Sequence, residues 1–245
     1  MSMPSPPESP YGPSAPYDWG VPPAVPTSPR KRRVRLALGV VGVALGLLFV
    51  VNVTIAQVEE ATGADLPKAE FALTLPKSLL DDRYELAQNL SGTDGRKMEE
   101  ALAHSRNSKV THAVVARYGL YGDATKGALV ISGFYGRIRN TDRIRVGALR
   151  SDGRAPGATV LVPPKDVTPS GSDVRISCEV LTRKPAGATL TYPVCSWADG
   201  NTSALVAEMT FGAINPDLDL KAAARTTLQI RAEIRKRIGA AVTRS

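Results

Sequence analysis

The sequence predicts an α+β protein, in which an antiparallel or mixed sheet with packed helices follows one transmembrane helix and a disordered tail. An apolar run from Leu36 to Ala56 predicts the transmembrane helix, and ten prolines within residues 1–29 predict the tail. Beyond them, alternating Val, Ile and Tyr residues are interleaved with apolar residues at helical spacing. We therefore divide the chain into a proline-rich cytoplasmic tail (1–29), a transmembrane helix (34–58) and an extracytoplasmic domain (59–245).

The apolar run is long enough to cross a lipid bilayer. Leu36 to Val51 contains sixteen residues without a charge or a hydrogen-bonding side chain. The twenty-one residues from Leu36 to Ala56, at about 1.5 Å each in a helix, span roughly 31 Å, close to the hydrocarbon thickness. A helix also pairs its backbone polar groups internally, as a lipid environment demands. We predict one retained membrane span.

The basic residues on the N-terminal side of this run predict its orientation. They are Arg30, Lys31, Arg32, Arg33 and Arg35. Because basic residues stay on the cytoplasmic side of a cell membrane, we expect the tail inside and the large domain outside. The alternative is a cleaved signal peptide, since Arg32-Arg33 is a twin-arginine pair and Thr54-Ile55-Ala56 offers small residues for cleavage. The length of the run favours the anchor.

Two N-terminal features suggest partners. Three glycines lie on one face of the predicted helix, where a second copy could approach and form a homodimer: Gly39, Gly42 and Gly46. Glycine is common in membrane helices anyway, so the composition favours the interpretation without a dimer. In the tail, five prolines recur at every third residue and would line one edge of a polyproline II helix. A proline-binding protein or a kinase could recognise this tail, although its composition is typical of an unstructured segment.

The charge distribution argues against a nucleic-acid partner. The chain has a net charge of +8 and a pI near 9.7. Residues 1–56 contribute +3, residues 57–216 contribute +1 and residues 217–245 contribute +4, so most of the predicted domain is nearly neutral. The two cysteines, Cys178 and Cys195, both fall in the domain assigned to the outside. An oxidising compartment favours a disulfide between them over two unpaired buried thiols.

Helices and strands alternate in the first half of the domain. Helical spacing and capping residues predict helices at residues 78–86, 94–107 and 141–150, the last with Thr141 as its N-cap. Runs of Val, Ile and Tyr predict strands at 110–120 and 128–135, and shorter ones at 71–75 and 158–162. Ala128 to Ile131 is apolar at every position, which suits a central strand covered on both faces. Pro163-Pro164 is expected to end the strand that starts at residue 158.

The region from Val174 to Phe211 predicts three adjacent strands. The first alternates apolar and polar residues from Val174 to Val180, which predicts a single buried face. The second is expected from Leu190 to Ala198. Asp199-Gly200 is a tight-turn signal before the third.

The spacing of the cysteines predicts the register of the first two strands. If Cys178 faces Cys195 in an antiparallel pair, Leu181 faces Tyr192 and Ala186-Gly187 forms a two-residue turn. We therefore predict adjacent hairpin strands bridged by the disulfide. Pro193 lacks an N–H, so a bulge or an unpaired position is expected there, and Trp197 is expected to cover the bridge.

A final helix is expected from Asn215-Pro216-Asp217 to about Ile238. Apolar residues at spacings of three and four predict one buried stripe. The opposite face is basic, with Lys221, Arg225, Arg231 and Arg235. Such a face is usually solvated, although it could contact anionic lipid headgroups or an envelope polymer.

Four segments carry a resemblance to a known family. They are Asp123-Ala124-Thr125-Lys126-Gly127, Pro163-Pro164-Lys165-Asp166, Pro169-Ser170-Gly171-Ser172-Asp173 and Cys195-Ser196-Trp197-Ala198-Asp199-Gly200-Asn201-Thr202. With them, the chain resembles an uncharacterised family of actinobacterial single-pass membrane proteins. The resemblance implies a proline-rich tail, one membrane span and an outer domain with a cysteine pair. It implies no catalytic residue, because that family has no assigned activity.

The sequence contains no recognisable catalytic, cofactor or metal motif. Gly-x-Ser-x-Gly, His-Glu-x-x-His and phosphate-loop patterns are absent from it. His104 and His112 are eight residues apart without a neighbouring carboxylate cluster, which makes a poor metal site. Asp199, Asn201 and Thr202 cluster beside Trp197, where turn chemistry explains their presence. We therefore expect no catalytic residue, no cofactor and no metal ligand.

Three functions remain open. The leading hypothesis is a membrane-anchored protein whose extracytoplasmic domain binds an envelope protein or polymer without chemistry. The alternatives are a cell-envelope enzyme with a site assembled from dispersed polar residues, and a signalling protein that acts through its cytoplasmic tail. For the enzyme, the candidate residues are Asp123, Lys126, Asp166 and Asp199. A deep pocket that collects these side chains would favour the enzyme.

Overall fold

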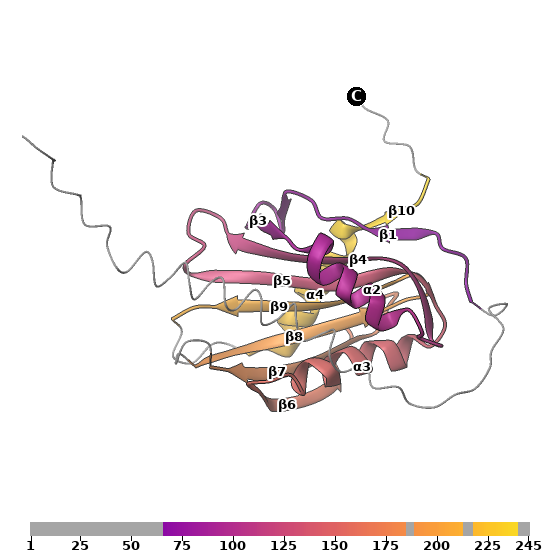
Figure 1. The fold of residues 1–245 in the computed structure, drawn as a ribbon. Helices are drawn as coiled ribbons and strands as arrows, with labels where there is room; N and C mark the ends of the chain where they lie inside the picture. Colours follow the sequence, from indigo (N-terminus) through magenta and orange to yellow (C-terminus); the bar gives the residue numbers. More distant parts are fainter. Residues whose placement is uncertain (1–65, 185–188, 213–217, 240–245) are drawn as a thin grey trace, which may run out of the picture.

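An eight-stranded sheet forms the centre of the domain (Figure 1). The computed structural model describes residues 66–184, 189–212 and 218–239, which also contain three α-helices and a two-stranded sheet. The strands of the large sheet follow the order β2-β3-β4-β5-β9-β8-β7-β6, and every described neighbouring pair is antiparallel. The predicted α+β class with an antiparallel sheet is confirmed. The strands are β1 (Phe71–Leu73), β2 (Ser78–Leu79), β3 (Tyr84–Asn89), β4 (Ser108–Leu120), β5 (Gly127–Ile138), β6 (Ala158–Asp166), β7 (Ile176–Arg183), β8 (Leu190–Ala198), β9 (Thr202–Thr210) and β10 (Arg235–Arg237).

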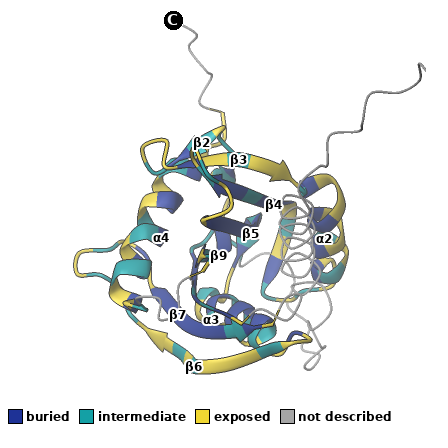
Figure 2. Cartoon of the chain, turned by 90° about the vertical axis from the view of Figure 1, so that its left-hand side faces the viewer, coloured by how far each residue is buried: buried dark blue, intermediate teal, exposed yellow. Residues whose placement is uncertain are grey.

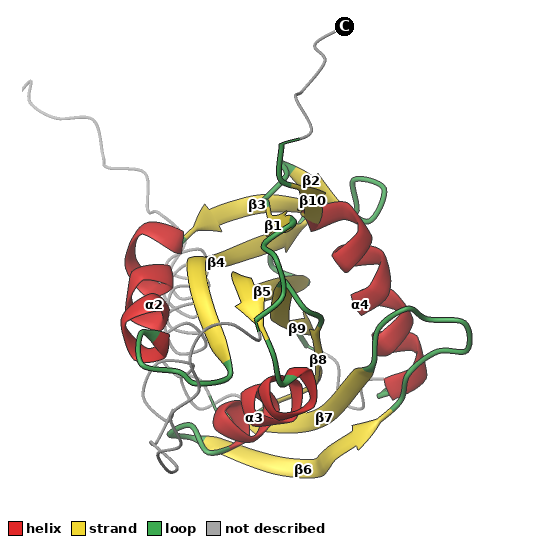
Figure 3. Cartoon of the chain, turned by 90° about the vertical axis from the view of Figure 1, so that its right-hand side faces the viewer, coloured by secondary structure: helices red, strands yellow, loops and turns green. Residues whose placement is uncertain are grey.

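Helices cover both faces of this sheet. α2 (Arg96–Leu102) and α3 (Thr141–Gly153) lie on one face, and α4 (Leu220–Ile234) lies on the other (Figure 3). The core under α2 and α3 contains Met98 and Leu149, whereas the core under α4 contains Trp197 and Ile230. Burial is accordingly greatest in the central strands (Figure 2). Each face of the sheet therefore builds its own hydrophobic core.

The central position predicted for residues 128–131 is confirmed. These residues belong to β5, which lies between β4 and β9, and all four are buried. The close approach of β9 also explains Gly133 on the same strand. A Cβ at position 133 would lie 2.5 Å from the Cβ of Ala204, so only glycine fits without displacing β9.

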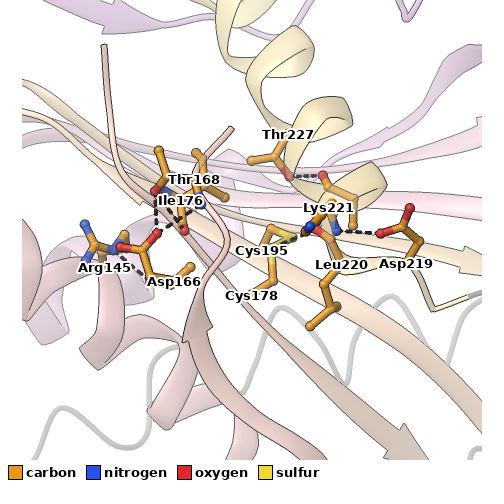
Figure 4. The surroundings of a disulfide bond; sticks show 12 residues. Arg145, Asp166, Thr168, Ile176, Cys178, Cys195, Asp219, Leu220, Lys221 and Thr227 are labelled. Carbon is orange, nitrogen blue, oxygen red and sulfur yellow. Dashed lines mark hydrogen bonds between the residues drawn. A yellow bond between two sulfur atoms is a disulfide. The ribbon is translucent and has the colours of Figure 1, made fainter. Parts of the chain in front are cut away.

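The hairpin of β7 and β8 confirms the predicted register. Cys178 faces Cys195, Leu181 faces Tyr192, and the cysteines form a disulfide with their Cα atoms 4.0 Å apart. The bridge lies against the first turn of α4, where Sγ of Cys178 is 3.9 Å from the carbonyl oxygen of Leu220 (Figure 4). Trp197 is buried in the same core. The expected turn at Ala186-Gly187 lies outside the described residues.

Pro193 is accommodated without a bulge. It pairs with Val180 in the regular register of β7 and β8, and the β8–β9 ladder starts one residue later, at Val194. The missing N–H therefore falls on the side where no ladder bond is required. Pro193 is therefore unpaired toward β9, as predicted, but it is paired with Val180 toward β7.

The helix predicted at residues 78–86 is wrong. This segment forms β2, a turn and the start of β3, and Leu79 pairs with Tyr84. Leu80, Asp81 and Asp82 adopt positive φ values of 57°, 54° and 61°, which are incompatible with a right-handed helix. Burial of Leu79 and Tyr84 against α4 and β4 overrides the helical spacing of the sequence.

Other boundaries differ from their predicted positions. The helix expected over 94–107 is shorter. A π-helical turn (Ser91–Gly95) precedes α2, and α2 ends at Leu102, before β4 begins at Ser108. α3 is capped by the Asn140 side chain, which accepts a hydrogen bond from the N–H of Arg143, and not by Thr141. Pro163-Pro164 does not end β6, because the strand bulges there and continues to Asp166 at the edge of the sheet.

The last helix differs from its prediction at both ends. Asp219 caps α4 by accepting a hydrogen bond from the N–H of Lys221, while 215–217 lie outside the described residues. The helix ends at Ile234, and β10 then pairs with β1. The apolar stripe is confirmed, since Leu220, Ile230 and Ile234 are buried.

The features assigned to the tail and the membrane lie outside the described residues. They are the prolines of 1–29, the basic group Arg30, Lys31, Arg32, Arg33 and Arg35, and the glycines Gly39, Gly42 and Gly46. In the part of the chain that the structure does describe, no helix combines the length and apolarity needed to cross a membrane.

Candidate functional site

The four polar residues proposed for an enzyme site do not come together. Asp123 and Lys126 lie in the loop between β4 and β5, whereas Asp166 ends β6 and Asp199 follows β8 at the opposite end of the sheet. The twelve residues of β5 separate these ends, which corresponds to roughly 40 Å at about 3.3 Å per residue. This set therefore cannot form one catalytic site.

Each of the four instead has a local partner. Oδ1 of Asp123 accepts a hydrogen bond from the N–H of Thr125, and Lys126 lies 3.7 Å from its other oxygen. Asp166 binds Thr168 and Arg175 in the same manner. Hydrogen bonds from Thr168 and Arg175 outweigh the effect of partial burial and lower the pKa of Asp166 to about 2. These contacts are typical of loop and turn residues.

We call the end of the sheet where β5 ends and β9 begins the basic end, and the opposite end the neutral end. Figure 3 views the basic end and Figure 2 the neutral end. The names describe the charges. The basic end contains thirteen Lys or Arg and six Asp or Glu. They lie in residues 66–70, 104–109, 137–145, 165–176, 199–202 and 231–237. The neutral end contains seven Lys or Arg and seven Asp or Glu. They lie in residues 81–85, 117–127, 150–158, 179–184 and 208–212.

Asn201 joins three segments at the basic end. Its Oδ1 accepts a hydrogen bond of 3.0 Å from the N–H of Glu70, and its Nδ2 lies 2.6 Å from the carbonyl oxygen of Lys68. The same Nδ2 donates to the carbonyl oxygens of Gly136 and Gly200. Asn201 is only 6% exposed. It therefore fixes residues 68–70 beside the end of β5 and the start of β9.

Asp199 links the β8–β9 turn to α4. Its Oδ1 accepts from the N–H groups of Asn201 and Thr202 at 2.9 and 2.7 Å, and its Oδ2 accepts from Arg231 at 2.8 Å. Arg235 Nε lies 3.2 Å from the same Oδ2. Burial alone would raise the pKa of Asp199, but the hydrogen bonds from Arg231 and the turn outweigh it and lower this pKa. Asp199 is thus an ionised structural anchor.

These contacts change the role assigned to the last helix. Arg231, expected on a solvated basic face, is buried and binds both Asp199 and Asp173. Arg235 is half-buried and lies over the ring of Phe71, 3.2 Å from its centroid. The interpretation of Asp199, Asn201 and Thr202 as turn residues is confirmed, and they additionally hold tertiary contacts.

A second polar cluster, which the sequence did not reveal, lies beneath α3 at the neutral end. Glu179 and Arg183 of β7, Tyr192 of β8 and Asp152 of α3 form it, and all four are buried. Arg183 donates to Asp152 with a distance of 2.7 Å. Neither carboxylate oxygen of Glu179 has a hydrogen-bond partner among the described residues, and the Tyr192 hydroxyl makes no bond there either.

Burial controls the protonation of this cluster. Desolvation, together with the nearby charge of Asp152, raises the pKa of Glu179 from 4.5 to about 8, and Arg183 only partly opposes this. Burial also raises the pKa of Asp152, again against Arg183. Glu179 is therefore mainly a neutral carboxylic acid at pH 7, which reduces the cost of its burial.

Alternation in β7 assigned Glu179 to an exposed face, because polar residues alternate there with Ile176, Cys178 and Val180. In the fold, β7 is buried on both sides. A Cβ at Gly153 would lie 3.4 Å from Oε2 of Glu179, so the last turn of α3 covers this side chain directly. The one signal for its burial in the sequence is that a glutamate stands between Cys178 and Val180, in a strand of residues that favour β structure.

The described residues offer no metal centre, and the cavity between α4 and the sheet is small. His112 Nδ1 lies 2.7 Å from Glu99, His104 is exposed elsewhere, and no group of three metal-ligating side chains occurs in residues 66–184, 189–212 and 218–239. A small cavity of about 10 Å³ lies between α4 and the β8–β9 pair, lined in part by Pro193, Cys195 and Thr227. This volume is at the lower limit for one water molecule.

The described surface is therefore distinguished by its charge, and the basic end is the candidate interaction site. The resemblance to an actinobacterial membrane-protein family stays a prediction. Comparison of the chain with protein-family models, with curated proteins and with solved structures gave no match.

Proposed function

We propose that this chain is a single-pass membrane protein that presents a non-catalytic binding domain outside the cytoplasm. The observation that carries this proposal is the disulfide between Cys178 and Cys195, which is buried between the sheet and α4. Disulfides of this structural kind persist in oxidising compartments. The apolar run of residues 36–56 and the basic residues before it supply an anchor with the matching orientation.

The fold supports a binding role over chemistry. The polar residues that could have formed an enzyme site lie at opposite ends of the sheet, and each is engaged in local or structural contacts. The buried acid Glu179 lies under the last turn of α3, and both of its carboxylate oxygens are shielded from solvent. A domain of this kind would bind a partner through its exposed charged surface.

Protease accessibility tests the orientation. The full chain, with one epitope at residues 1–29 and another after Ser245, is expressed in a bacterial membrane, and protease is added to spheroplasts. We expect loss of the C-terminal epitope and retention of the N-terminal one. Retention of the C-terminal epitope with loss of the other would contradict the proposal. Mass spectrometry of the N-terminus checks the alternative, because a mature chain that starts near Gln57 would show cleavage of a signal peptide.

Thiol labelling tests the observation that carries the proposal. Without reductant, the denatured wild-type chain should not react with a maleimide reagent, since both cysteines are in the bridge. After reduction, it should react twice. Labelling of the unreduced chain isolated from the membrane would mean that the domain does not reside in an oxidising compartment.

A further inference from the structure

Five basic side chains lie together where the chain joins the basic end of the sheet. We call them the basic rim: Lys68, Arg106, Lys109, Arg137 and Arg139. Lys109 and Arg137 face each other across β4 and β5. The Arg139 guanidinium donates to the carbonyl oxygen of Arg106. These contacts join residues from three distant parts of the sequence into one surface.

The basic rim also holds the incoming chain. The Arg137 guanidinium donates to the carbonyl oxygens of Leu66 and Pro67, at 2.7 and 2.8 Å. Asn201 fixes Lys68 as described above. Residues 66–68 are therefore held in place by Arg137 of the rim and by Asn201.

The distance from the predicted span to the rim is short. Seven residues, 59–65, connect the predicted transmembrane helix (34–58) to Leu66. A fully extended chain covers at most about 3.5 Å per residue, so this link spans no more than roughly 25 Å. Leu66 and the rim beside it therefore cannot lie farther than roughly 25 Å from the end of the predicted span.

The charge of this end is unusual for the molecule. At the basic end, Lys68, Arg106, Lys109 and Arg139 are exposed. The link contributes Glu59, Glu60 and Asp65, but thirteen basic residues at this end still exceed these three and the six local acids together. Asp142, Asp166, Asp173 and Asp199 are already engaged by arginines.

We propose that the basic rim binds the anionic headgroups of the outer membrane leaflet and sets the domain on the membrane with its neutral end pointing away. This inference rests on the proposed function, because it needs the predicted span to hold the domain at the bilayer. Each Lys or Arg near an anionic lipid surface contributes attraction that decays within a Debye length. Binding of a surface rather than of one ligand fits basic residues that are spread along one edge of the domain.

Hydrogen exchange of the full chain in proteoliposomes tests the inference. Vesicles contain either phosphatidylcholine alone or phosphatidylcholine with phosphatidylglycerol, at low salt. We expect the exposed amides of residues 66–70 and 104–109 to exchange about tenfold more slowly with phosphatidylglycerol. A slowing of this size corresponds to the attraction of a few Lys or Arg side chains to an anionic surface. Salt at about 0.5 M should abolish the difference, because the Debye length then falls to about 4 Å.

Charge reversal at two lysines provides the matched comparison. Lys68→Glu with Lys109→Glu should remove the slow exchange, whereas Lys126→Glu with Lys184→Glu, at the neutral end, should retain it. All four lysines are exposed, so folding is expected to tolerate each pair. Slow exchange that survives the first pair, or that is equal in both kinds of vesicle, would overturn the inference.

Two further outcomes identify what has failed. Addition of inorganic polyphosphate to phosphatidylcholine vesicles imitates an anionic envelope polymer, and protection by polyphosphate without protection by phosphatidylglycerol would overturn the lipid assignment in favour of a polymer. Flotation of the proteoliposomes in alkaline carbonate reports the anchor independently. A chain that floats but shows no lipid-dependent protection contradicts only this inference, whereas a chain that does not float contradicts the proposed function as well.

Discussion

The two ends of the sheet treat a buried carboxylate in opposite ways. At the basic end, Asp199 receives hydrogen bonds from two backbone N–H groups, a threonine hydroxyl and Arg231, and its pKa is lowered. At the neutral end, Glu179 receives none from the described residues, and its pKa is raised to about 8. The first group is held ionised by its partners, and the second is held neutral by the absence of water.

This difference separates two structural roles. Asp199 and Asn201 connect β8, β9, α4 and the N-terminal segment, so the basic end depends on contacts between residues far apart in the sequence. Glu179 makes no such connection, and α3 simply packs over it. A paired buried charge organises this fold at one end, while an unpaired acid is only tolerated at the other.

The largest effect is expected from Asp199→Ala. It removes the charge partner of buried Arg231 and leaves two turn N–H groups without their acceptor, so the free energy of unfolding should fall by about 4 kcal/mol. Chemical denaturation of the full chain in detergent measures this value. Asp166→Ala, which removes an exposed ion pair at the same end, should cost less than about 1 kcal/mol. Equal losses for the two variants would show that Asp199 is not a special anchor.

A second prediction concerns the disulfide that joins β7 and β8, between the basic end and the neutral end of the sheet. Replacing Cys178 and Cys195 together by alanine should lower the free energy of unfolding by about 3 kcal/mol, the entropy of a closed loop of this size. Because this entropy belongs to the unfolded chain, the protection of amides in β4 and in β8 should decrease by the same factor in native-state exchange. A loss confined to one end would mean that the bridge acts through local packing.

An effect with the opposite sign, and one that is small at low pH, is expected from Glu179→Gln. Between pH 4.5 and about pH 8 the folded chain keeps a proton on Glu179 that the unfolded chain has lost, so wild-type stability should decline as the pH rises across this window. Glutamine cannot ionise. The variant should therefore gain stability relative to wild type as the pH rises, and the gain should level off above about pH 8.

Denaturation of both chains at pH 5, 7 and 9 checks this prediction. The Asp199 carboxylate should show the reverse dependence. Its lowered folded-state pKa supplies stability that is present above the unfolded value of about 3.8 and is lost as the pH falls through the folded value. A parallel pH dependence of wild type and Glu179→Gln would contradict the assignment of Glu179 as a protonated acid.

The β7–β8 hairpin was predictable because its information is local. Cys178, Cys195 and the glycine at 187 have a spacing that only one antiparallel register satisfies without extra residues. The apolar residues 128–131 of β5 were equally informative, since no charge interrupts them. By contrast, the segment from Ser78 to Leu86 has spacing compatible with a helix, and only contacts with β4 and α4 make it a hairpin.

The candidate interaction site was only partly predictable. Basic residues were noticed in the last helix, yet Arg231 and Arg235 turn inward to Asp199. The basic rim comes from positions 68, 106, 109, 137 and 139, none of which forms a charged run in the sequence. Their proximity depends on the antiparallel return of β5 beside β4 and on the hydrogen bonds of Asn201.

The sequence by itself determined the α+β class, the partner of each cysteine and the central place of β5, because alternation, turn residues and spacing act between near neighbours. Only the tertiary structure decided which polar groups are buried and which charges gather. Glu179 and Arg231 are ordinary in the sequence, and they become buried because α3, α4 and the sheet close over them. Burial and electrostatic potential are sums over groups brought together by folding, and no local pattern contains those sums.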